Sequence, residues 1–599
     1  MGDNGGKLMG LCGCGILSLL IVAVLTAGIL LFWPKPTQKA TVTVKTNYGS
    51  LQGWLAQVSQ KTNKTSFERA QVFLGIPYAK PPVGDLRFKK PQKHEPWSGV
   101  KLAQKFGSPC FGTTKFDSKL HFVEDYPPKS EDCLFLNVFA PDDSNAQKEN
   151  ATLHPVMFFL HGGGFQFGSS VEYGIQGIVD GLVSRGVVVV TLNYRLHISG
   201  FFTTEDEHAK GNNGLWDQLA ALTWVNENIV VFGGDPNRTT LFGMSAGGAS
   251  IGHLMLTRHA KGMVHRAIFM SGEPLGHGWF TEGENMTLAR SLAFAAQLGC
   301  HYDQLNSSSS AVVACMRNRT MESIVNTTGA AAATRVGPYL DGDFFSSTIP
   351  ELIAEEAPDI PVIIGISELE GGLWVTDTPL AVGSYYNVRN EPVSFDLFVN
   401  ETLRMAKSPL ISRGLIAAND TSHDSEVSEA LLDLYLPSRE NASAEETTRQ
   451  YAMLYGDMYV AADWVHFARL LLNSTTRTSN VWLYQFEHYN NGCFPETHLL
   501  KEAFHTMELR YVFKKEVIFN CEEWSVEDES VSETVVDLFT NFARDGDPND
   551  GDGSRGEWEP TNRQNQDLYL RISTDLNMGD GLKRRERAFW KEQLSNIFA

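Results

Sequence analysis

The stretch TLFGMSAGGAS at residues 240–250 joins a short apolar run to the pattern Gly-x-Ser-x-Gly, formed by Gly243, Ser245 and Gly247. This order predicts a strand that turns sharply into a helix, with Ser245 at the apex of the turn. Glycine is favoured on both sides of the serine because a side chain there would collide with the neighbouring strand and helix. The helix start directs backbone N–H groups at whatever the serine attacks. We therefore interpret Ser245 as a candidate nucleophile.

The pattern alone also fits a Gly-rich turn without chemistry, so the interpretation depends on the other parts that a serine nucleophile needs. Those parts are a base, a carboxylate that orients the base, and N–H donors for the oxyanion. In this strand–turn–helix layout the donors precede the serine in the chain, and the acid and then the histidine follow it. The chain offers a candidate for each part in that order.

The candidate oxyanion donors follow an apolar run at residues 156–160. This run leads directly into the sequence HGGGF, which contains His161, Gly163 and Gly164. Glycines just past a strand end let backbone N–H groups approach a substrate without interference from Cβ atoms. Together with the N–H of Ala246 they would form a hole with three donors. We interpret His161 as a structural residue that holds this loop.

The candidate acid and base lie later in the chain. The sequence GISELEGG follows an apolar run at 362–364, and Glu370, which directly precedes a glycine, is our preferred acid, with Glu368 as the alternative. Among the sixteen histidines, His505 follows Glu370 in the required order and stands just before a predicted helix. His488 lies close to the end of a predicted strand at 481–486 and stays open as an alternative base.

The remaining pattern predicts a doubly wound α/β architecture with a large, mostly parallel central sheet flanked by helices. Short runs that are apolar on both faces suit strands covered by helices on both sides. A helix is predicted over residues 217–228, and a β-hairpin is predicted at the start of the domain, from Thr41. The short apolar runs lie at 156–160, 187–190, 240–242, 267–270, 362–364 and 481–486.

Residues 8–33 carry no charge over 26 positions. As a helix they would span roughly 39 Å, which exceeds the bilayer core of about 30 Å. The run is longer than the apolar region of a cleavable signal peptide and lacks a small-residue cleavage site. We expect a cytosolic tail at 1–7, a transmembrane signal anchor at 8–33, a stalk at 34–40 and one domain at 41–599. The alternative is a cleaved signal, which would leave a secreted protein.

Sequons and cysteines indicate where the domain resides. The eleven Asn-x-Ser/Thr sites exceed what composition alone would give and predict a glycosylated domain that is extracellular or lumenal: Asn63, Asn150, Asn237, Asn285, Asn306, Asn318, Asn326, Asn400, Asn419, Asn441 and Asn473. An even number of cysteines in such a domain predicts three disulfides, with fifteen possible pairings: Cys110, Cys133, Cys300, Cys315, Cys493 and Cys521.

The composition limits the partners. The 50 Lys and Arg residues against 70 Asp and Glu give a net charge of −20, which argues against nucleic-acid binding through a basic face. An apolar content of 42% is ample for a large core. The chemistry of the candidate residues requires no metal and no cofactor.

The chain resembles the type-B carboxylesterase/cholinesterase family of α/β-hydrolases over nearly all of residues 41–599. The resemblance implies the α/β-hydrolase fold, with Ser245 as nucleophile, Glu370 as acid, His505 as base, and Gly163, Gly164 and Ala246 as oxyanion donors. It also implies the disulfides Cys110–Cys133 and Cys300–Cys315, and leaves Cys493 to pair with Cys521. The motifs that carry it are GIPYA at 75–79, EDCLFLNV at 131–138, HGGGF at 161–165, GNNGLWDQ at 211–218, FGGDP at 232–236 and FGMSAGGAS at 242–250.

Two departures from the family bear on the substrate. Many members carry glutamate immediately before the serine, where this chain has Met244. Cholinesterases carry a choline-binding tryptophan in the first disulfide loop, and the corresponding position here is Val123. A quaternary ammonium group is held mainly by an aromatic face. We therefore expect a preference for neutral esters without selection for choline.

Together these features predict a membrane-anchored, glycosylated serine carboxylesterase that hydrolyses small-molecule esters through an acyl-enzyme intermediate. One alternative is a non-catalytic adhesion protein of the same family, against which the intact set of candidate catalytic residues argues. The other is an acyltransferase that uses the same residues and replaces water by an alcohol, and the motifs do not separate it from a hydrolase. The sequence does not specify the oligomeric state.

Overall fold

The computed structural model divides the chain into two units, Met1–Thr41 and Val42–Ala599. The predicted anchor at 8–33, Val123, Cys493 and Cys521 lie outside the residues that the structure describes. No helix within the described ranges is long and apolar enough to cross a membrane. The described ranges are 40–59, 66–112, 126–143, 152–276, 280–281, 286–327, 336–375, 393–412, 416, 420–436, 442–474, 477–490, 500–514, 524–551 and 557–597.

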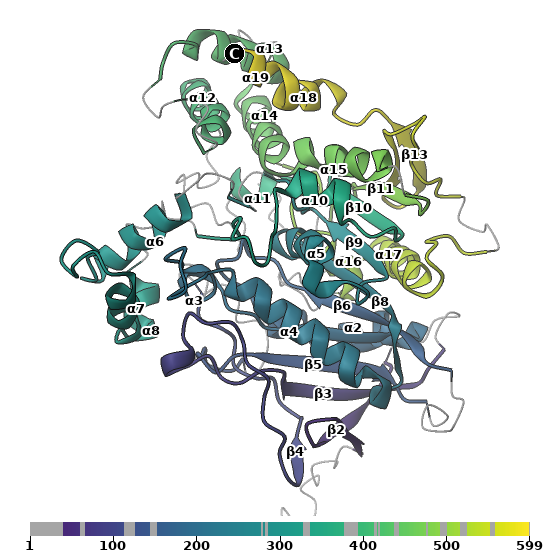
Figure 1. The fold of residues 1–599 in the computed structure, drawn as a ribbon. Coiled ribbons are helices and arrows are strands. Elements are labelled where there is room, and N and C mark those ends of the chain that lie inside the picture. Colours follow the sequence, from purple (N-terminus) through teal and green to yellow (C-terminus); the bar gives the residue numbers. More distant parts are fainter. Residues whose placement is uncertain are drawn as a thin grey trace, which may run out of the picture. The chain divides into compact units, whose positions relative to one another are not determined.

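A single 13-stranded sheet forms the centre of the unit Val42–Ala599 (Figure 1), in the order β1-β2-β3-β5-β7-β6-β8-β9-β10-β11-β12-β13, with β4 paired to β2. The strands are β1 (Thr41–Lys45), β2 (Ser50–Gln57), β3 (Arg69–Pro77), β4 (Val100–Leu102), β5 (Phe135–Pro141), β6 (His154–Leu160), β7 (Val188–Leu192), β8 (Gly234–Met244), β9 (Arg266–Met270), β10 (Val362–Ser367), β11 (Val481–Phe486), β12 (Leu568–Ile572) and β13 (Leu576–Asp580).

The middle of the sheet is parallel, as the sequence predicts. Every pairing from β7 through β6, β8, β9, β10 and β11 to β12 is parallel. The flanks are antiparallel, at β2–β3, β3–β5, β5–β7 and β12–β13, which agrees with a sheet that is mostly but not wholly parallel. A short connection, such as the turn from Thr46 to Gly49 between β1 and β2, can join only antiparallel neighbours. All six short apolar runs form strands.

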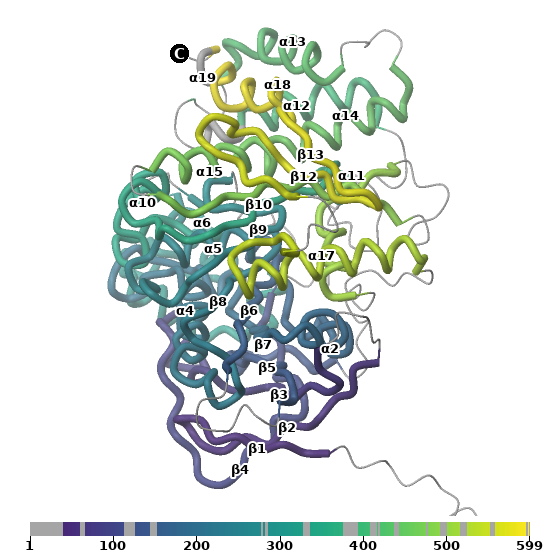
Figure 2. The backbone as a smooth tube through the Cα atoms, turned by 90° about the vertical axis from the view of Figure 1, so that its right-hand side faces the viewer, coloured from purple at the N-terminus to yellow at the C-terminus, as the bar shows by residue number. Residues whose placement is uncertain are grey.

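Helices cover both faces of the sheet, so the doubly wound prediction is confirmed. Figure 2 shows α4, α5 and α10 on one side of the strands and α2 and α17 on the other. Two separate apolar cores correspond to the two faces. The first face carries α4 (Asn213–Asn228), α5 (Ala246–Leu256), α10 (Ile349–Glu355) and α15 (Ala462–Asn473). The second carries α2 (Gln176–Gly181), α16 (Leu509–Val512) and α17 (Val526–Asp545). The helix predicted over 217–228 is α4, which begins earlier, at Asn213.

A third apolar core lies among the helices that follow β10 and the last helices of the chain (Figure 1). Phe398, Leu431, Tyr451 and Phe589 are buried in it. The helix α14 leads without a break into a π-helical segment at Asp457–Ala461 and then into α15, and α14 packs against α11. These helices are α11 (Gly372–Val375), α12 (Phe395–Ser412), α13 (Asp424–Tyr435), α14 (Ala444–Gly456), α18 (Arg584–Ala588) and α19 (Leu594–Ile597).

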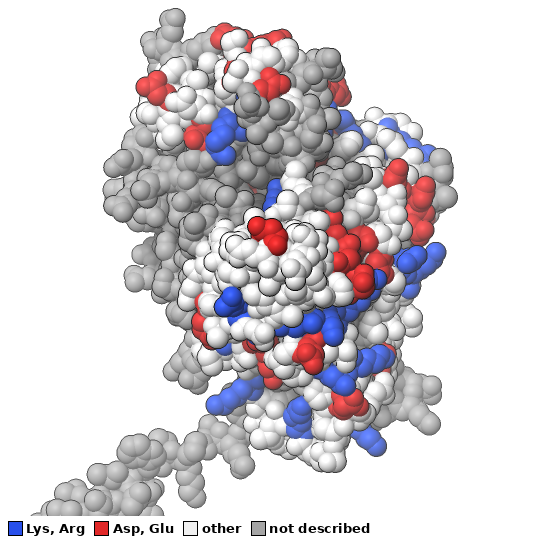
Figure 3. Space-filling view, turned by 60° about the vertical axis from the view of Figure 1, so that its left-hand side comes forward, with Lys and Arg blue, Asp and Glu red and all other residues white. Residues whose placement is uncertain are grey.

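Two of the three expected disulfides lie in the described ranges, and both are present. Cys110 pairs with Cys133, and Cys300 pairs with Cys315. The second bond joins the end of α6 to α7 in a peripheral helical segment made of α6 (Met286–Gln297), α7 (Ser309–Arg317) and α8 (Met321–Asn326). A short helix, α3 (His197–Phe201), precedes α4. On the face shown in Figure 3, acidic and basic side chains are intermixed.

A buried charge pair ties the start of α4 to the loop after β7. The backbone N–H, Nε and Nη2 of Arg195 all donate to the carboxylate of Asp217, and both side chains are buried. Removing one partner of such a pair leaves an uncompensated charge in the core. We expect Asp217→Asn to cost about 3–5 kcal/mol of unfolding free energy and to lower the thermal midpoint.

The matched control is the exposed pair of Arg544 and Asp545, whose Nε and carboxylate oxygen lie 3.0 Å apart. Because exposed pairs contribute only about 0–1 kcal/mol, Asp545→Asn should leave the midpoint almost unchanged. Equal midpoint losses for the two variants in a calorimetric scan would contradict this account.

Candidate active site

Ser245 is the single residue between β8, which ends at Met244, and α5, which begins at Ala246. Its backbone is strained, with φ 60° and ψ −125°, and its N–H donates to Met270 O at 2.8 Å. A Cβ atom on Gly247 would lie 2.0 Å from Leu160 O, and one on Gly243 would lie 2.7 Å from the same oxygen. Only glycine fits at these positions. The structure therefore contains the strand–turn–helix elbow that residues 240–250 predict.

The glycine loop after β6 lies beside this elbow. A Cβ atom on Gly162 would come within 3.1 Å of Ser245 Cβ. Gly163 and Gly164 have φ values of +104° and +61°, which side chains disfavour. Among the described residues, no acceptor receives the N–H of either glycine. Ala246 is the first residue of α5, so its N–H has no acceptor within the helix. Three N–H groups are therefore available around Ser245.

His161 supports this loop from behind. Its ring stacks on Tyr194 with centroids 4.3 Å apart, and the Tyr194 hydroxyl donates to His161 O at 2.8 Å. Complete burial lowers the pKa of His161 to about 4, so the ring is neutral at pH 7. A neutral, buried imidazole that stacks on a neighbour matches the structural role expected for it.

Glu370 and His505 form a buried pair. His505 Nδ1 lies 2.6 Å from Glu370 Oε2, and both side chains are almost fully buried. The N–H of Ser367 donates to Glu370 Oε1 at 2.6 Å, which fixes the carboxylate. An isolated bridge between Leu369 and Phe504 brings the two loops together. A carboxylate on Nδ1 leaves Nε2 of the imidazole to act as a base.

The two alternatives do not join this pair. The carboxylate of Glu368 lies near Glu487 and Glu502, and burial raises its pKa to about 7. His488 Nε2 contacts Asp528 Oδ1 at 2.8 Å, at the start of α17. Of the two glutamates and two histidines left open by the sequence, the structure brings together only Glu370 and His505.

The sheet brings the candidate nucleophile and the acid–base pair to one edge. Ser245 follows β8, Glu370 follows β10, and β9 lies between these two parallel strands. Both residues therefore lie past the C-terminal ends of parallel strands, at the same edge of the sheet. The structure, which describes both residues, has no hydrogen bond between Ser245 Oγ and His505. A hydrogen bond between a nucleophile and its base is often long in the absence of substrate and shortens when substrate binds.

A second buried carboxylate, Glu508, adjoins the pair. Its Oε1 accepts from Ser271 Oγ at 2.9 Å, and its Oε2 accepts from Ser367 Oγ at 3.1 Å. Burial, and then the charge of Glu370, raise the pKa of Glu508 to about 7. The sequence assigns this residue no role. Its only signal is an acidic residue three positions after His505.

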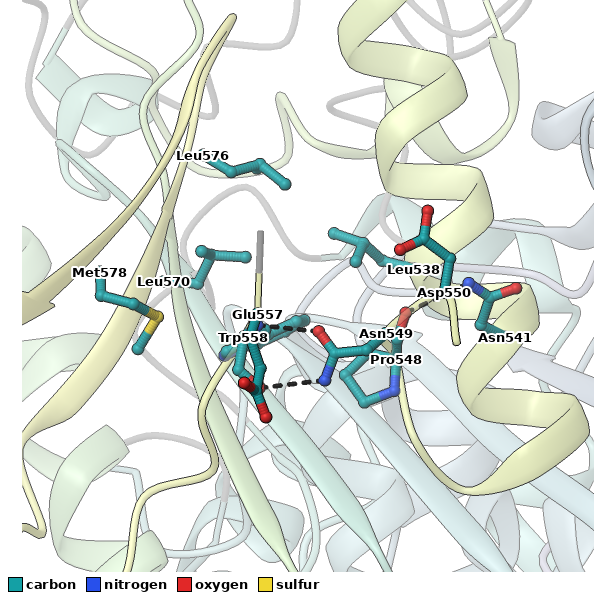
Figure 4. Close-up of a pocket in the computed structure, with 10 residues that line it drawn as sticks. All are labelled: Leu538, Asn541, Pro548, Asn549, Asp550, Glu557, Trp558, Leu570, Leu576 and Met578. Carbon is teal, nitrogen blue, oxygen red and sulfur yellow. Dashed lines mark hydrogen bonds between the residues drawn. The ribbon is translucent and has the colours of Figure 1, made fainter. Parts of the chain in front are cut away.

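The cavity in Figure 4 is separate from this set. It lies between α17 and the β12–β13 pair, has a volume of about 40 Å³, and contains none of the predicted catalytic or oxyanion residues. Asn549 closes one side through hydrogen bonds to the backbone of Trp558. The lining consists of Leu538, Asn541, Pro548, Asn549, Asp550, Glu557, Trp558, Leu570, Leu576 and Met578.

The sequence is similar to proteins of one family. A model described as the carboxylesterase family matches residues 40–590. The chain is 32% identical over 590 residues, 97% of both proteins, to a duck (Anas platyrhynchos) protein named medium-chain fatty acyl-CoA hydrolase precursor. It is 31% identical over 564 residues, 92% of both, to gut esterase 1 of Caenorhabditis elegans. It is 33% identical over 563 residues to carboxylesterase 5A of Mus musculus, covering 91% of this chain and 89% of that protein.

The raised pKa of Glu508 predicts a pH-dependent stability. Its pKa is about 7 in the folded protein against the ordinary 4.5, so the folded state keeps a proton that the unfolded chain releases. This contribution to stability is complete below pH 4.5 and is lost as the pH rises to 7. Glutamine does not titrate. We therefore expect the thermal midpoint of Glu508→Gln, relative to wild type, to rise between pH 5 and pH 8.

The control is Glu322→Gln, at an exposed position on α8. Its midpoint difference from wild type should stay constant over the same pH range. If the difference for Glu508→Gln is equally flat, Glu508 is ionised throughout and the raised pKa is wrong.

Proposed function

Because the chain belongs to the carboxylesterase family, we propose that it is a serine carboxylic ester hydrolase that works through an acyl-enzyme intermediate. The observation that carries the proposal is the 2.6 Å contact between His505 Nδ1 and Glu370 Oε2, at the same edge of the sheet as the strained serine elbow. A buried carboxylate–imidazole pair is costly to maintain and serves the proton transfers of acyl-group chemistry.

In the proposed mechanism, Ser245 Oγ attacks the ester carbonyl while His505 Nε2 takes the serine proton. The carbonyl oxygen becomes an oxyanion and accepts hydrogen bonds from the N–H groups of Gly163, Gly164 and Ala246. Losing one such donor typically costs about 2.7–4 kcal/mol in the transition state. His505 then gives its proton to the leaving alcohol. It later takes a proton from the water that attacks the acyl-enzyme and returns it to Ser245 Oγ as the carboxylic acid leaves. Glu370 holds the tautomer of His505.

The substrates proposed are neutral esters of small molecules. The side chain before the nucleophile, Met244, is uncharged and buried, so it offers no counter-ion to a cationic substrate. The relatives carry names of esterases and of an acyl-CoA hydrolase, and an acyl-CoA is a thioester that the same steps would cleave. An acyltransferase would share the first half of the mechanism and differ only in the acceptor of the acyl group.

We further propose that the protein is a membrane-anchored glycoprotein with its hydrolase domain extracellular or lumenal. The uncharged run at 8–33 supports the anchor. Glycosylation requires accessible asparagines, and all six sequon asparagines in the described ranges are exposed: Asn237, Asn306, Asn318, Asn326, Asn400 and Asn473. Cysteine pairing at Cys110–Cys133 and Cys300–Cys315 also favours an oxidising compartment.

We expect Ser245→Ala to abolish hydrolysis of ethyl butyrate and labelling by a fluorophosphonate, because Ser245 supplies the only nucleophile of the mechanism. Glu370→Gln should lower kcat/KM by about a thousandfold or more, since the imidazole loses the carboxylate that orients it. Glu368→Gln, two positions away, is the matched control and should retain activity within a few fold. A larger loss for Glu368→Gln than for Glu370→Gln would move the acid to the other glutamate.

We expect the mature protein to keep its N-terminal segment and to lose apparent mass on treatment with an N-glycosidase. Both follow from the anchor and from the exposed sequons. N-terminal sequencing that starts beyond residue 33, with the protein in the medium, would replace the anchor by a cleaved signal. An unchanged mass after N-glycosidase treatment would exclude the glycoprotein assignment.

A further inference from the structure

Four large apolar side chains are exposed on two segments that flank the turn between β1 and β2. Val100 and Leu102 lie on β4, and Val230 and Val231 lie in the 3-10 turn Ile229–Phe232 that follows α4. Their exposed fractions run from 38% for Val231 to 66% for Leu102. The described ranges hold eight exposed large hydrophobic side chains, so half of them lie on these two segments. We call these four residues the apolar corner.

Contacts at the β1–β2 turn bring the two segments together. Ser50, just after the turn, pairs with Val100 on β4. The N–H of Asn47, in the turn, donates to Asn228 Oδ1 at 2.9 Å, two residues before Val230. Figures 1 and 2 show β2 and β4 at the same end of the sheet. Exposed apolar side chains that gather at one place in this way mark an interaction surface.

A lysine and two aromatic side chains adjoin the apolar corner. Lys101 stands between Val100 and Leu102 on β4, and its Nζ lies 4.4 Å from the centre of the Trp97 ring. Trp97 is only half-buried, and it stacks on Tyr48 with centroids 6.5 Å apart. Lysine stems that follow apolar surface, with tryptophan and tyrosine beside them, are typical of protein surfaces at the headgroup level of a membrane.

The charge beside the apolar corner is positive. Glu95 and Glu227, the carboxylates on its segments, each lie within 2.7 Å of a lysine ammonium. Lys45, at the exposed end of β1, and Lys101 have no described carboxylate within ion-pair distance. These two lysines therefore remain to attract the phosphate and carboxylate groups of anionic lipids.

The chain enters the same end of the sheet directly from the proposed anchor. The uncharged run ends at residue 33 and β1 begins at Thr41, so seven residues separate them. Seven extended residues span at most about 25 Å. Because β1 is the neighbour of β2 in the sheet, a bilayer that holds residues 8–33 lies within reach of the apolar corner.

From these observations we infer that the apolar corner is a lipid-binding surface, which rests on the bilayer with Val100 and Leu102 at the boundary between headgroups and acyl chains. The inference rests on the proposed membrane anchor and goes beyond it, because it assigns the face of the hydrolase domain that meets the lipid. Lys101 would extend its ammonium to the headgroups from between the two apolar side chains.

The test uses the full-length protein in phosphatidylcholine vesicles, with the background substitutions Cys12→Ser and Cys14→Ser. An environment-sensitive fluorophore is attached at Leu102→Cys or at Val231→Cys, and lipid with a nitroxide on its acyl chain supplies the quencher. We expect the nitroxide to lower the emission at both positions at least about twofold, because interfacial surfaces enter the headgroup–acyl boundary by about 5–10 Å.

Val526→Cys is the matched control, because Val526 is 83% exposed and lies on another element, at the start of α17. The nitroxide should leave the emission there unchanged. Replacing about one fifth of the phosphatidylcholine by phosphatidylserine should increase the quenching at Leu102→Cys, and adding Lys101→Gln should remove that increase.

The unlabelled protein gives an independent measurement, so a cysteine variant that fails to fold does not block the test. Brominated phosphatidylcholine should quench part of its tryptophan emission, and Trp97→Phe should reduce the quenched part. Quenching at Leu102→Cys and Val231→Cys no greater than at Val526→Cys overturns the surface. A concentration-dependent dimer that Leu102→Asp dissociates, with both probes unquenched, also overturns it, because the apolar corner would then bind a second copy of the chain.

Failure of the surface is distinguishable from failure of the anchor. If the mature protein keeps its N-terminal segment and the probes are not quenched, the anchor stands and the surface is wrong. If N-terminal sequencing shows a cleaved signal, the mature protein is floated with vesicles of phosphatidylcholine and phosphatidylserine. Binding that Leu102→Asp lowers by about tenfold or more then supports the surface without the anchor. Absence of binding overturns both.

Discussion

The candidate site depends on backbone segments that approach Ser245 more closely than any side chain would allow. Gly247 presses on the end of β6, Gly272 presses on the carbonyl of Ser245 itself, and Gly162 reaches the serine from the oxyanion loop. A single methyl group at any of these glycines would collide with the neighbouring segment and prevent the contact. The strained backbone of Ser245, at φ 60°, is held by this packing, because three surrounding segments over-determine its position. The nucleophile is thereby presented without a flexible loop.

Buried charges then determine which groups hold protons at the edge where β8, β9 and β10 end. Glu370 and Glu508 are both buried beside His505, and two like charges in a low-dielectric interior oppose each other's ionisation. The serine at the end of β10, Ser367, contacts both carboxylates, through its N–H and its hydroxyl. Glu508 can then hold a proton near neutral pH beside the Glu370 carboxylate that contacts the imidazole. The parallel strands make this arrangement possible because they end at the same edge.

The sequence predicts those features that depend on residues close together in the chain. The elbow around Ser245, the glycine loop and the order of acid and base all follow from local patterns, and the two disulfides follow from the family resemblance. Apart from the N-terminal hairpin, which the sequence predicts, the antiparallel pairings at the flanks of the sheet do not, because a short strand carries no mark of its partner's direction. Glu508 escapes for a related reason. Its partners Ser271 and Ser367 lie 237 and 141 residues away in the chain, and one sequence does not reveal such contacts.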